Sequence, residues 1–257
     1  MRVLDIDLDF FVHGVARFRS RELGRLNREE FPPWSIDETM RFLGEHCGLG
    51  TGDESSPKLP GVALEYHADV FFVWRDAIEQ GYLDVPFIVN HLDAHADLGL
   101  GDAGYHYLMT DLLFQPVQDR SHKRELEDHI HDGNFLSFAV ACRWVSDLIY
   151  VYNEVGGGND ILHLHMEHYA RAASNLQLKA VTAEALKGNA GYYGEPDASE
   201  LEPLVPFTKL HWKDFQVEES FDFVCLTRSP DYTPPESDEL YDEIRQRFID
   251  EDAWQLG

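Results

Sequence analysis

Three potential metal ligands alternate with alanine in the stretch Asp93-Ala94-His95-Ala96-Asp97. The apolar run 85–89 before them predicts a buried strand, and alternate residues of a strand point to the same face. If the extended backbone continues to residue 97, the three side chains converge. Carboxylates and imidazole at the end of a strand suit a divalent cation, so we predict a metal site here.

A second acidic segment, near the N-terminus, has the same alternation. Residues 3–11 form a predicted strand in which apolar residues alternate with Asp5, Asp7 and Asp9. Three carboxylates on one face repel one another unless a cation or a hydrogen-bond donor lies among them. We therefore favour metal binding over a solvent-exposed edge strand for this segment.

His67 is the third candidate ligand segment. It directly precedes residues 68–80, which have the periodicity of an amphipathic helix ending at Gly81. Asp5 and His91 each lie two residues before a candidate ligand. They are candidates for hydrogen-bonding a ligand from outside the metal's own shell.

The elements that must position these side chains alternate between strands and helices. Predicted strands cover 3–11, 85–89, 147–152 and 221–227, and predicted helices cover 20–30, 35–45, 68–80, 135–144 and 237–249. This alternation predicts one α/β domain over 1–257 with a mostly parallel sheet, in which ligands gather at the carboxyl ends of strands. We expect residues 17–60 to form a helical and loop insertion.

The charge balance bears on partners. The chain has 21 Lys and Arg against 47 Asp and Glu, a formal net charge of −26. Such a charge argues against nucleic acid and anionic membranes as partners and favours a cationic ligand. The alternative is that the acidity serves only solubility.

The cysteines bear on the compartment. Cys47, Cys142 and Cys225 are far apart and include no Cys-x-x-Cys pair, which indicates a reducing environment. The N-terminus carries acidic residues where a signal peptide needs an apolar run, and no stretch has the uncharged length of a membrane span. We therefore expect a soluble cytoplasmic protein.

The ligand pattern resembles a known superfamily. The stretch 93–97 is similar to the Asp-Ala-His-x-Asp signature of the ureohydrolases, the arginases and agmatinases. Asp7-Leu8-Asp9 resembles their Asp-x-Asp strand, and His67 resembles their first histidine ligand. The resemblance implies a three-layer arginase-like fold and a centre of two Mn²⁺ ions.

The motif order differs from that of arginases. In arginases the Asp-x-Asp strand follows the Asp-x-His-x-Asp strand, whereas here it comes first, and 221–227 resembles the family's last strand. We interpret this order as a circular permutation, which is tolerated at surface loops. With Glu65-x-His67, Asn134-Phe135 and Thr227-Arg228-Ser229, the chain resembles an arginase-like family that includes bacterial peptide arginases. These enzymes convert arginine side chains of ribosomally made precursor peptides into ornithine.

The resemblance implies a role for each ligand. One Mn²⁺ would be bound by His67, Asp93, Asp97 and Asp7, and the other by His95, Asp93, Asp7 and Asp9. Two such ions lower the pKa of a bridging water, giving a hydroxide that attacks the guanidinium carbon. The ions and carboxylates, Asp9 included, would stabilise the tetrahedral intermediate.

Other roles also have candidates. His106 lies in the loop after the metal motif, roughly where arginases keep a proton-carrying histidine; the alternative is an ordinary surface histidine. Arginases hold the guanidinium with a Glu at the end of the last strand, but this chain has Leu226-Thr227-Arg228 there. We rank Asp231 first for that role, before Glu236 and Glu65.

The loop 98–104 bears on the substrate. Arginases for free arginine hold its charged ends with Asn, Thr and Ser residues after the metal motif, and these are missing from this loop. We expect an arginine-containing precursor peptide, which an acidic surface would also attract. The alternatives are an agmatinase-like or deacetylase-like amidohydrolase, and a non-catalytic metal-binding module acting through protein contacts.

Residues 160–178 contain His163, His165 and His168. On a helix only the last two share a face, so we favour a solvated or packed helix face over a histidine metal cluster. The sequence leaves open the target peptide, the choice among Mn²⁺, Fe²⁺ and Co²⁺, and whether the chain forms a homo-oligomer.

Overall fold

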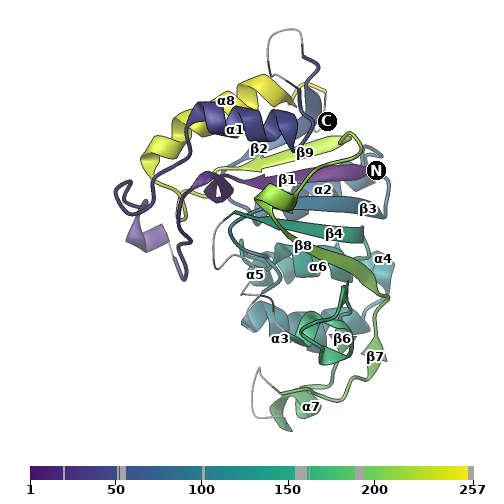
Figure 1. The fold of residues 1–257 in the computed structure, drawn as a ribbon. Coiled ribbons are helices and arrows are strands. Elements are labelled where there is room, and N and C mark those ends of the chain that lie inside the picture. The colour runs from purple at the N-terminus through teal and green to yellow at the C-terminus, as the bar shows by residue number, and fades with distance from the viewer. Residues whose placement is uncertain are drawn as a thin grey trace.

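An eight-stranded sheet forms the centre of the protein, for which we describe a computed structural model (Figure 1). The structure describes residues 1–19, 21–50, 52, 56–99, 102–153, 161, 163–188 and 194–253. The strand order is β10-β2-β9-β1-β3-β4-β8-β5, and every pair is parallel except β5 with β8. The predicted α/β class with a mostly parallel central sheet is confirmed.

The strands differ in length, and the longer ones occupy the middle of the sheet. They are β1 (Arg2–Asp7), β2 (Leu59–Leu64), β3 (Phe87–Leu92), β4 (Val145–Tyr152), β5 (Asn175–Leu176), β8 (Val205–His211), β9 (Phe223–Thr227) and β10 (Ile249–Asp250). A separate antiparallel pair consists of β6 (Lys179–Ala180) and β7 (Glu200–Leu201).

Helices connect the strands. The α-helices are α1 (Ile36–Glu45), α2 (Asp69–Glu79), α3 (Ala103–Thr110), α4 (Val117–Arg120), α5 (Leu126–His129), α6 (Phe135–Ala141), α7 (Ala183–Gly188) and α8 (Asp238–Phe248). Short 3-10 turns include η1 (Leu8–Phe11), η4 (His163–His165), η5 (Glu167–Tyr169) and η7 (Pro235–Ser237). None of the helices in the described part of the chain is long and apolar enough to cross a bilayer.

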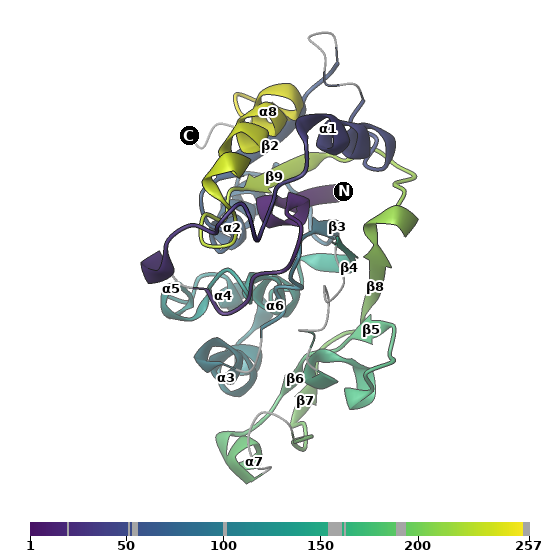
Figure 2. The same cartoon turned by 60° about the vertical axis from the view of Figure 1, so that its left-hand side comes forward.

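Helices cover both faces of the sheet (Figures 1 and 2). On one face, Trp74 of α2 and Phe135 of α6 share a core with Val89 of β3. On the other face, α1 and α8 lie side by side, and their apolar side chains pack against β1 and β9. Within the segment 17–60, α1 thus contributes to the core of the main fold.

The N-terminal strand is central and buried. It pairs with β9 on one side and β3 on the other, so the alternative of a solvent-exposed edge strand is wrong. It ends at Asp7, and η1 follows it, where the sequence predicted continuous strand to residue 11. Apolar burial on both sides of β1 therefore places its acidic residues inside the molecule.

One other prediction differs from the structure, and two strands of the main sheet were missed. The helix expected over 20–30 is replaced by the short 3-10 turn Arg21–Leu23 and further turns; Ser20 lies outside the described residues. The strands β2 and β8 were not predicted, because each contains a proline. In β2, Gly61 is required, since a Cβ there would clash with the main-chain oxygen of Val224 in β9.

Candidate metal centre

The candidate ligands come from three segments at the carboxyl ends of neighbouring strands. They are Asp7 at the end of β1, Asp9 in η1, His67 between β2 and α2, and Asp93, His95 and Asp97 after β3. The order β2-β9-β1-β3 brings these ends to one edge of the sheet. This is the edge at which parallel α/β proteins bind ligands.

The imidazole of His67 faces three carboxylates. Its Nδ1 atom lies 3.0 Å from Asp7 Oδ2, 3.2 Å from Asp93 Oδ2 and 3.0 Å from Asp97 Oδ2. All four side chains are buried, and His67 packs against the ring of Phe135. The structure thus brings together one imidazole nitrogen and three carboxylate oxygens away from solvent.

A second group surrounds His95. Its Nδ1 atom lies 3.0 Å from Asp9 Oδ2 and 3.5 Å from Asp93 Oδ1. Its Nε2 atom donates to the main-chain oxygen of Ala16 at 2.7 Å, which leaves Nδ1 to face the carboxylates. Asp93 therefore presents one oxygen to each histidine.

The ligands do not converge in the way that the alternation predicted. The strand β3 ends at Leu92, and Asp97 has a left-handed φ of 48°. The main-chain nitrogen of His95 donates to Asp93 Oδ1 at 2.6 Å, which curls the segment into a turn. The three side chains meet because this loop folds back, so the expectation of one continuous strand face was wrong.

A serine from the other end of the chain orients Asp7. The hydroxyl of Ser229 donates to Asp7 Oδ2 at 2.5 Å, and the main-chain nitrogen of Asp9 donates to Asp7 Oδ1 at 3.0 Å. Ser229 follows β9, the strand between β1 and β2. Ser229 belongs to the Thr227-Arg228-Ser229 motif of the resemblance, but no periodicity signals its contact with Asp7, because the two residues are 222 positions apart.

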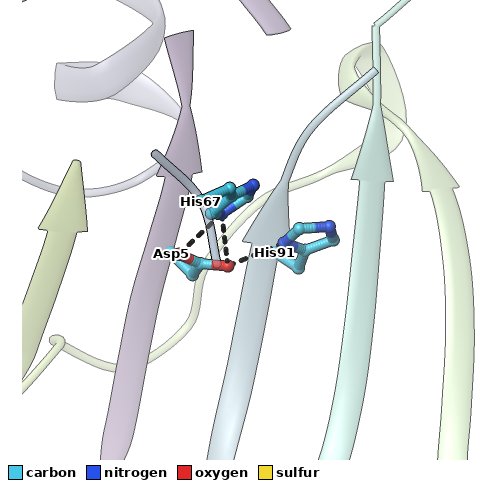
Figure 3. A group of neighbouring side chains, drawn as sticks. All are labelled: Asp5, His67 and His91. Carbon is cyan, nitrogen blue, oxygen red and sulfur yellow. Dashed lines mark hydrogen bonds and ion pairs between the residues drawn. The ribbon is translucent and has the colours of Figure 1, made fainter. Parts of the chain in front are cut away.

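Asp5 and His91 lie behind the ligands (Figure 3). The Asp5 carboxylate accepts hydrogen bonds from His67 Nε2 at 3.2 Å and from His91 Nδ1 at 2.8 Å. The other ring nitrogen of His91 lies 3.4 Å from Asp93 Oδ2. Both residues thus contact ligands, as their spacing in the sequence led us to expect.

Some of the crowded carboxylates hold protons more tightly when no cation is present, whereas the neighbouring histidines lower the pKa of Asp93 against the effect of burial. Burial and the charge of Asp93 raise the pKa of Asp97 to about 8. Burial and neighbouring carboxylates raise the pKa of Asp9 well above its usual range. Burial would lower the pKa of His67 and of His95, but the surrounding carboxylates outweigh it and raise both. Protons thus occupy the place that a metal ion would take.

The residues present fit a divalent cation. His67 Nδ1 and Asp93 Oδ2 are buried and have no hydrogen-bond partner, which is costly unless an ion contacts them. An octahedral ion about 2.1 Å from its ligands places adjacent ligand atoms about 3.0 Å apart, close to the spacing around His67. The mixture of carboxylate and imidazole suits Mn²⁺, Fe²⁺ or Co²⁺ and does not select among them.

A cavity of about 500 Å³ leads to these ligands. Asp7, His95 and Asp97 line it, together with Asp231, the residue ranked first for guanidinium binding. Tyr232 also lines it and packs its ring edge-on against His95, with ring centroids 5.1 Å apart. Three of the six predicted ligands and Asp231 therefore share one pocket.

The other predicted catalytic and substrate-binding residues do not line this cavity. Glu65 is exposed and pairs with Arg228 at 3.4 Å. Glu236 lies in η7, beside a different cavity. His106 lies within α3, where its Nδ1 atom is 3.3 Å from the Thr110 hydroxyl. The helix starts at residue 103, so His106 belongs to a helix and not to the loop in which we expected it.

Two residues of the cavity wall, His131 and Asp102, were not predicted as site residues. His131 lines the cavity, and its Nε2 atom donates to Asp102, another wall residue. Burial opposes protonation of His131, but the bond to Asp102 outweighs it and raises the pKa. The high charge of residues 119–131 predicts a surface helix, so the sequence does not indicate that His131 lines a cavity; the structure has the shorter α4 and α5 there. Of the loop 98–104, residues 100 and 101 lie outside the described part.

The three histidines of 163–168 are not on one helix. They lie in the two turns η4 and η5; His163 and His165 are buried and His168 is exposed. Burial and nearby Lys179 lower the pKa of His165 to about 4. The helix-face interpretation was wrong in its geometry, although no metal-binding group among the described residues includes these histidines.

Comparisons with known proteins do not extend this description. No protein-family model matches the chain, and a search of the curated proteins finds no match. The geometry of the site is therefore the basis for inferring function.

Proposed function

We propose that this protein is a binuclear metal hydrolase of the arginase type, which converts arginine side chains of a peptide into ornithine and urea. The observation that carries the proposal is the position of Asp93. Its two oxygens face two separate histidine nitrogens, one in each ligand group. A carboxylate shared in this way is what a two-ion centre requires.

Each ligand group would hold one ion. His67, Asp7, Asp93 and Asp97 form the first group, and His95, Asp9 and Asp93 the second, with Asp7 as a further shared ligand. When bound, two Mn²⁺ ions supply Lewis acidity and a water that ionises near neutral pH. Ser229 keeps Asp7 in the orientation that this arrangement needs.

The cavity suits a guanidinium group. Its wall includes Asp102, Asp132 and Asp231, besides the ligands. Asp102 is engaged by His131, and Asp132 accepts a hydrogen bond from the main-chain nitrogen of Ala68 at 2.8 Å. Asp231 is therefore our choice for the carboxylate that binds the substrate cation.

The lip of the cavity suits a peptide. Phe18 lines it and is 84% exposed, between Arg17 and Arg19, which also line it. An exposed aromatic side chain at a cavity mouth offers apolar contact to the residues that flank a bound arginine. We therefore keep a peptide in preference to free arginine as the substrate.

We assign the proton-carrying role to His131 in place of His106. A carboxylate bound to one ring nitrogen fixes the orientation of an imidazole, as Asp102 does for His131. An imidazole held beside the substrate can give a proton to the departing amine. The raised pKa of His131 favours the protonated form that this step needs, in which Nδ1 gives up the hydrogen bond that it accepts from the main-chain nitrogen of Gly133 at 3.2 Å.

We also propose an arginase-like fold with a rearranged motif order. The strand β1 lies between β9, which resembles the family's last strand, and β3, which leads into the Asp-x-His-x-Asp stretch. It occupies this place although it comes first along the chain. We propose that this order arose by the circular permutation expected from the sequence.

The experiment is to incubate the protein with Mn²⁺ and an arginine-containing peptide, and to record the peptide mass and urea. Hydrolysis of the guanidinium adds water and releases urea, so each converted arginine loses about 42 Da. Urea release from agmatine alone would favour the agmatinase-like alternative, and deacetylation the deacetylase-like one. Two bound ions without turnover of any of these would favour a non-catalytic metal-binding module.

A further inference from the structure

The Asp5 carboxylate is fully buried, and with His67 and His91 it forms a group whose ligand atoms are also close enough to hold an ion. Unlike the two groups that share Asp93, this group contains a single carboxylate. Figure 3 shows Asp5 between His67 and His91, with one strand contributing Asp5 and its neighbour His91. Both carboxylate oxygens lie 3.2 Å from His67 Nε2, and one lies 2.8 Å from His91 Nδ1. Because Asp5 can only accept, both of these ring nitrogens carry the proton.

This contact decides which nitrogen of His67 is available for a metal. With the proton on Nε2, the lone pair is on Nδ1, the atom that faces Asp7, Asp93 and Asp97. A carboxylate that accepts from a metal-bound imidazole also makes it a stronger ligand. His91 holds Asp5 in place from the other side, so the carboxylate cannot turn away from His67.

His95 has a weaker arrangement of the same kind. Its Nε2 atom donates to the neutral main-chain oxygen of Ala16 at 2.7 Å, not to a carboxylate. Its Nδ1 atom has two carboxylate neighbours within 3.5 Å, whereas that of His67 has three within 3.2 Å. The side chain of His95 is 16% exposed and that of His67 is fully buried.

We propose that Asp5 is a positioning residue that makes the His67 group the tighter half of the centre, so that the first ion binds there. The proposal rests on the two-ion site of the proposed function and not on the identity of the substrate. The charge of Asp5 and the larger number of ligands both favour the His67 group. The consequence is stepwise loading, with the His95 group filled second.

The test is Mn²⁺ titration of the metal-free protein by calorimetry in two single-site backgrounds. His95→Ala leaves the His67 group, and His67→Ala leaves the His95 group. In the His95→Ala background, Asp5→Asn should weaken Mn²⁺ binding about 10- to 100-fold. The Asn amide can donate to Nε2 of His67, which moves the ring proton to Nδ1, the atom that should bind the metal. In the second background Asp5→Asn should change binding less than about twofold. Asp147→Asn, a half-buried Asp on β4, is the matched control and should change neither.

Two results would overturn the proposal. If Asp5→Asn weakens Mn²⁺ binding equally in both backgrounds, Asp5 supports the fold in general. If it weakens Mn²⁺ binding in neither background, Asp5 does not act on His67. A second measurement needs no variant of Asp5: nitrogen NMR shifts of the protein loaded with Zn²⁺, a diamagnetic ion, should show His67 protonated at Nε2. Protonation at Nδ1 would contradict the proposal even where Asp5→Asn fails to fold. All of these readouts are independent of urea release.

Discussion

One carboxylate oxygen of Asp93 lies 3.2 Å from the Nδ1 atom of His67. The other oxygen lies 3.5 Å from the Nδ1 atom of His95. Asp93→Asn should therefore weaken the binding of both ions. Each affinity should fall by more than about 100-fold, because loss of a residue that only hydrogen-bonds a ligand already lowers metal affinity by up to that factor. Metal analysis after gel filtration would measure the ion content. Loss of one ion with full retention of the other would contradict the shared role.

The grouping of the candidate ligands could be predicted from the sequence, but their manner of convergence could not. Residue type and spacing identified Asp7, Asp9, His67 and the 93–97 stretch, because carboxylate and imidazole at strand ends have few other uses in a buried position. The turn at Asp97 depends on a hydrogen bond and a left-handed φ that no periodicity signals.

The fold was predicted in its class and not in its details. Strands with continuous apolar runs, such as β3 and β9, were recognised, because burial on both faces leaves a strong signal. The strands β2 and β8 contain Pro60 and Pro206, residues that normally argue against a strand. His131 and Ser229 were missed as site residues, because only the folded chain brings them to the cavity or to Asp7.

Metal binding should depend on pH in a direction set by the raised pKa values. In the metal-free protein the pKa of Asp97 is raised to about 8. Its protonated carboxyl group therefore stabilises the folded state at low pH, and this contribution to the free energy of unfolding is lost as pH rises through that value. His67 acts in the same direction. Mn²⁺ replaces these protons, so it should raise the melting temperature more at about pH 8 than at about pH 6. Thermal unfolding with and without Mn²⁺ measures this, and a larger shift at the lower pH would contradict it.

The proposed proton carrier can be separated from the earlier candidate by a pair of variants. His131→Gln should lower kcat for an arginine peptide by about 100-fold, the lower range for loss of a general acid, and flatten the pH profile. His106→Gln should leave kcat within about twofold, because His106 does not line the cavity. Steady-state urea release measures both. If His106→Gln lowered kcat and His131→Gln did not, His106 would be the proton carrier.

The proposed guanidinium carboxylate can be tested in the same way. Asp231→Asn removes a charge from the cavity wall and should raise KM about 10- to 100-fold, the range expected when a charge-assisted hydrogen bond is lost. Glu236→Gln and Glu65→Gln remove equal charges outside the cavity and should change KM little. If either control raised KM more than Asp231→Asn does, Asp231 would not be the carboxylate that binds the substrate cation.

The central claim is that two ions share Asp93, and anomalous X-ray scattering from Mn²⁺-soaked crystals tests it most directly. The geometry predicts two peaks about 3.5–4 Å apart, one at His67 Nδ1 and one at His95 Nδ1, with Asp93 touching both. A single peak at saturating Mn²⁺, or peaks at other residues, would contradict the two-ion centre and the hydrolase proposed from it.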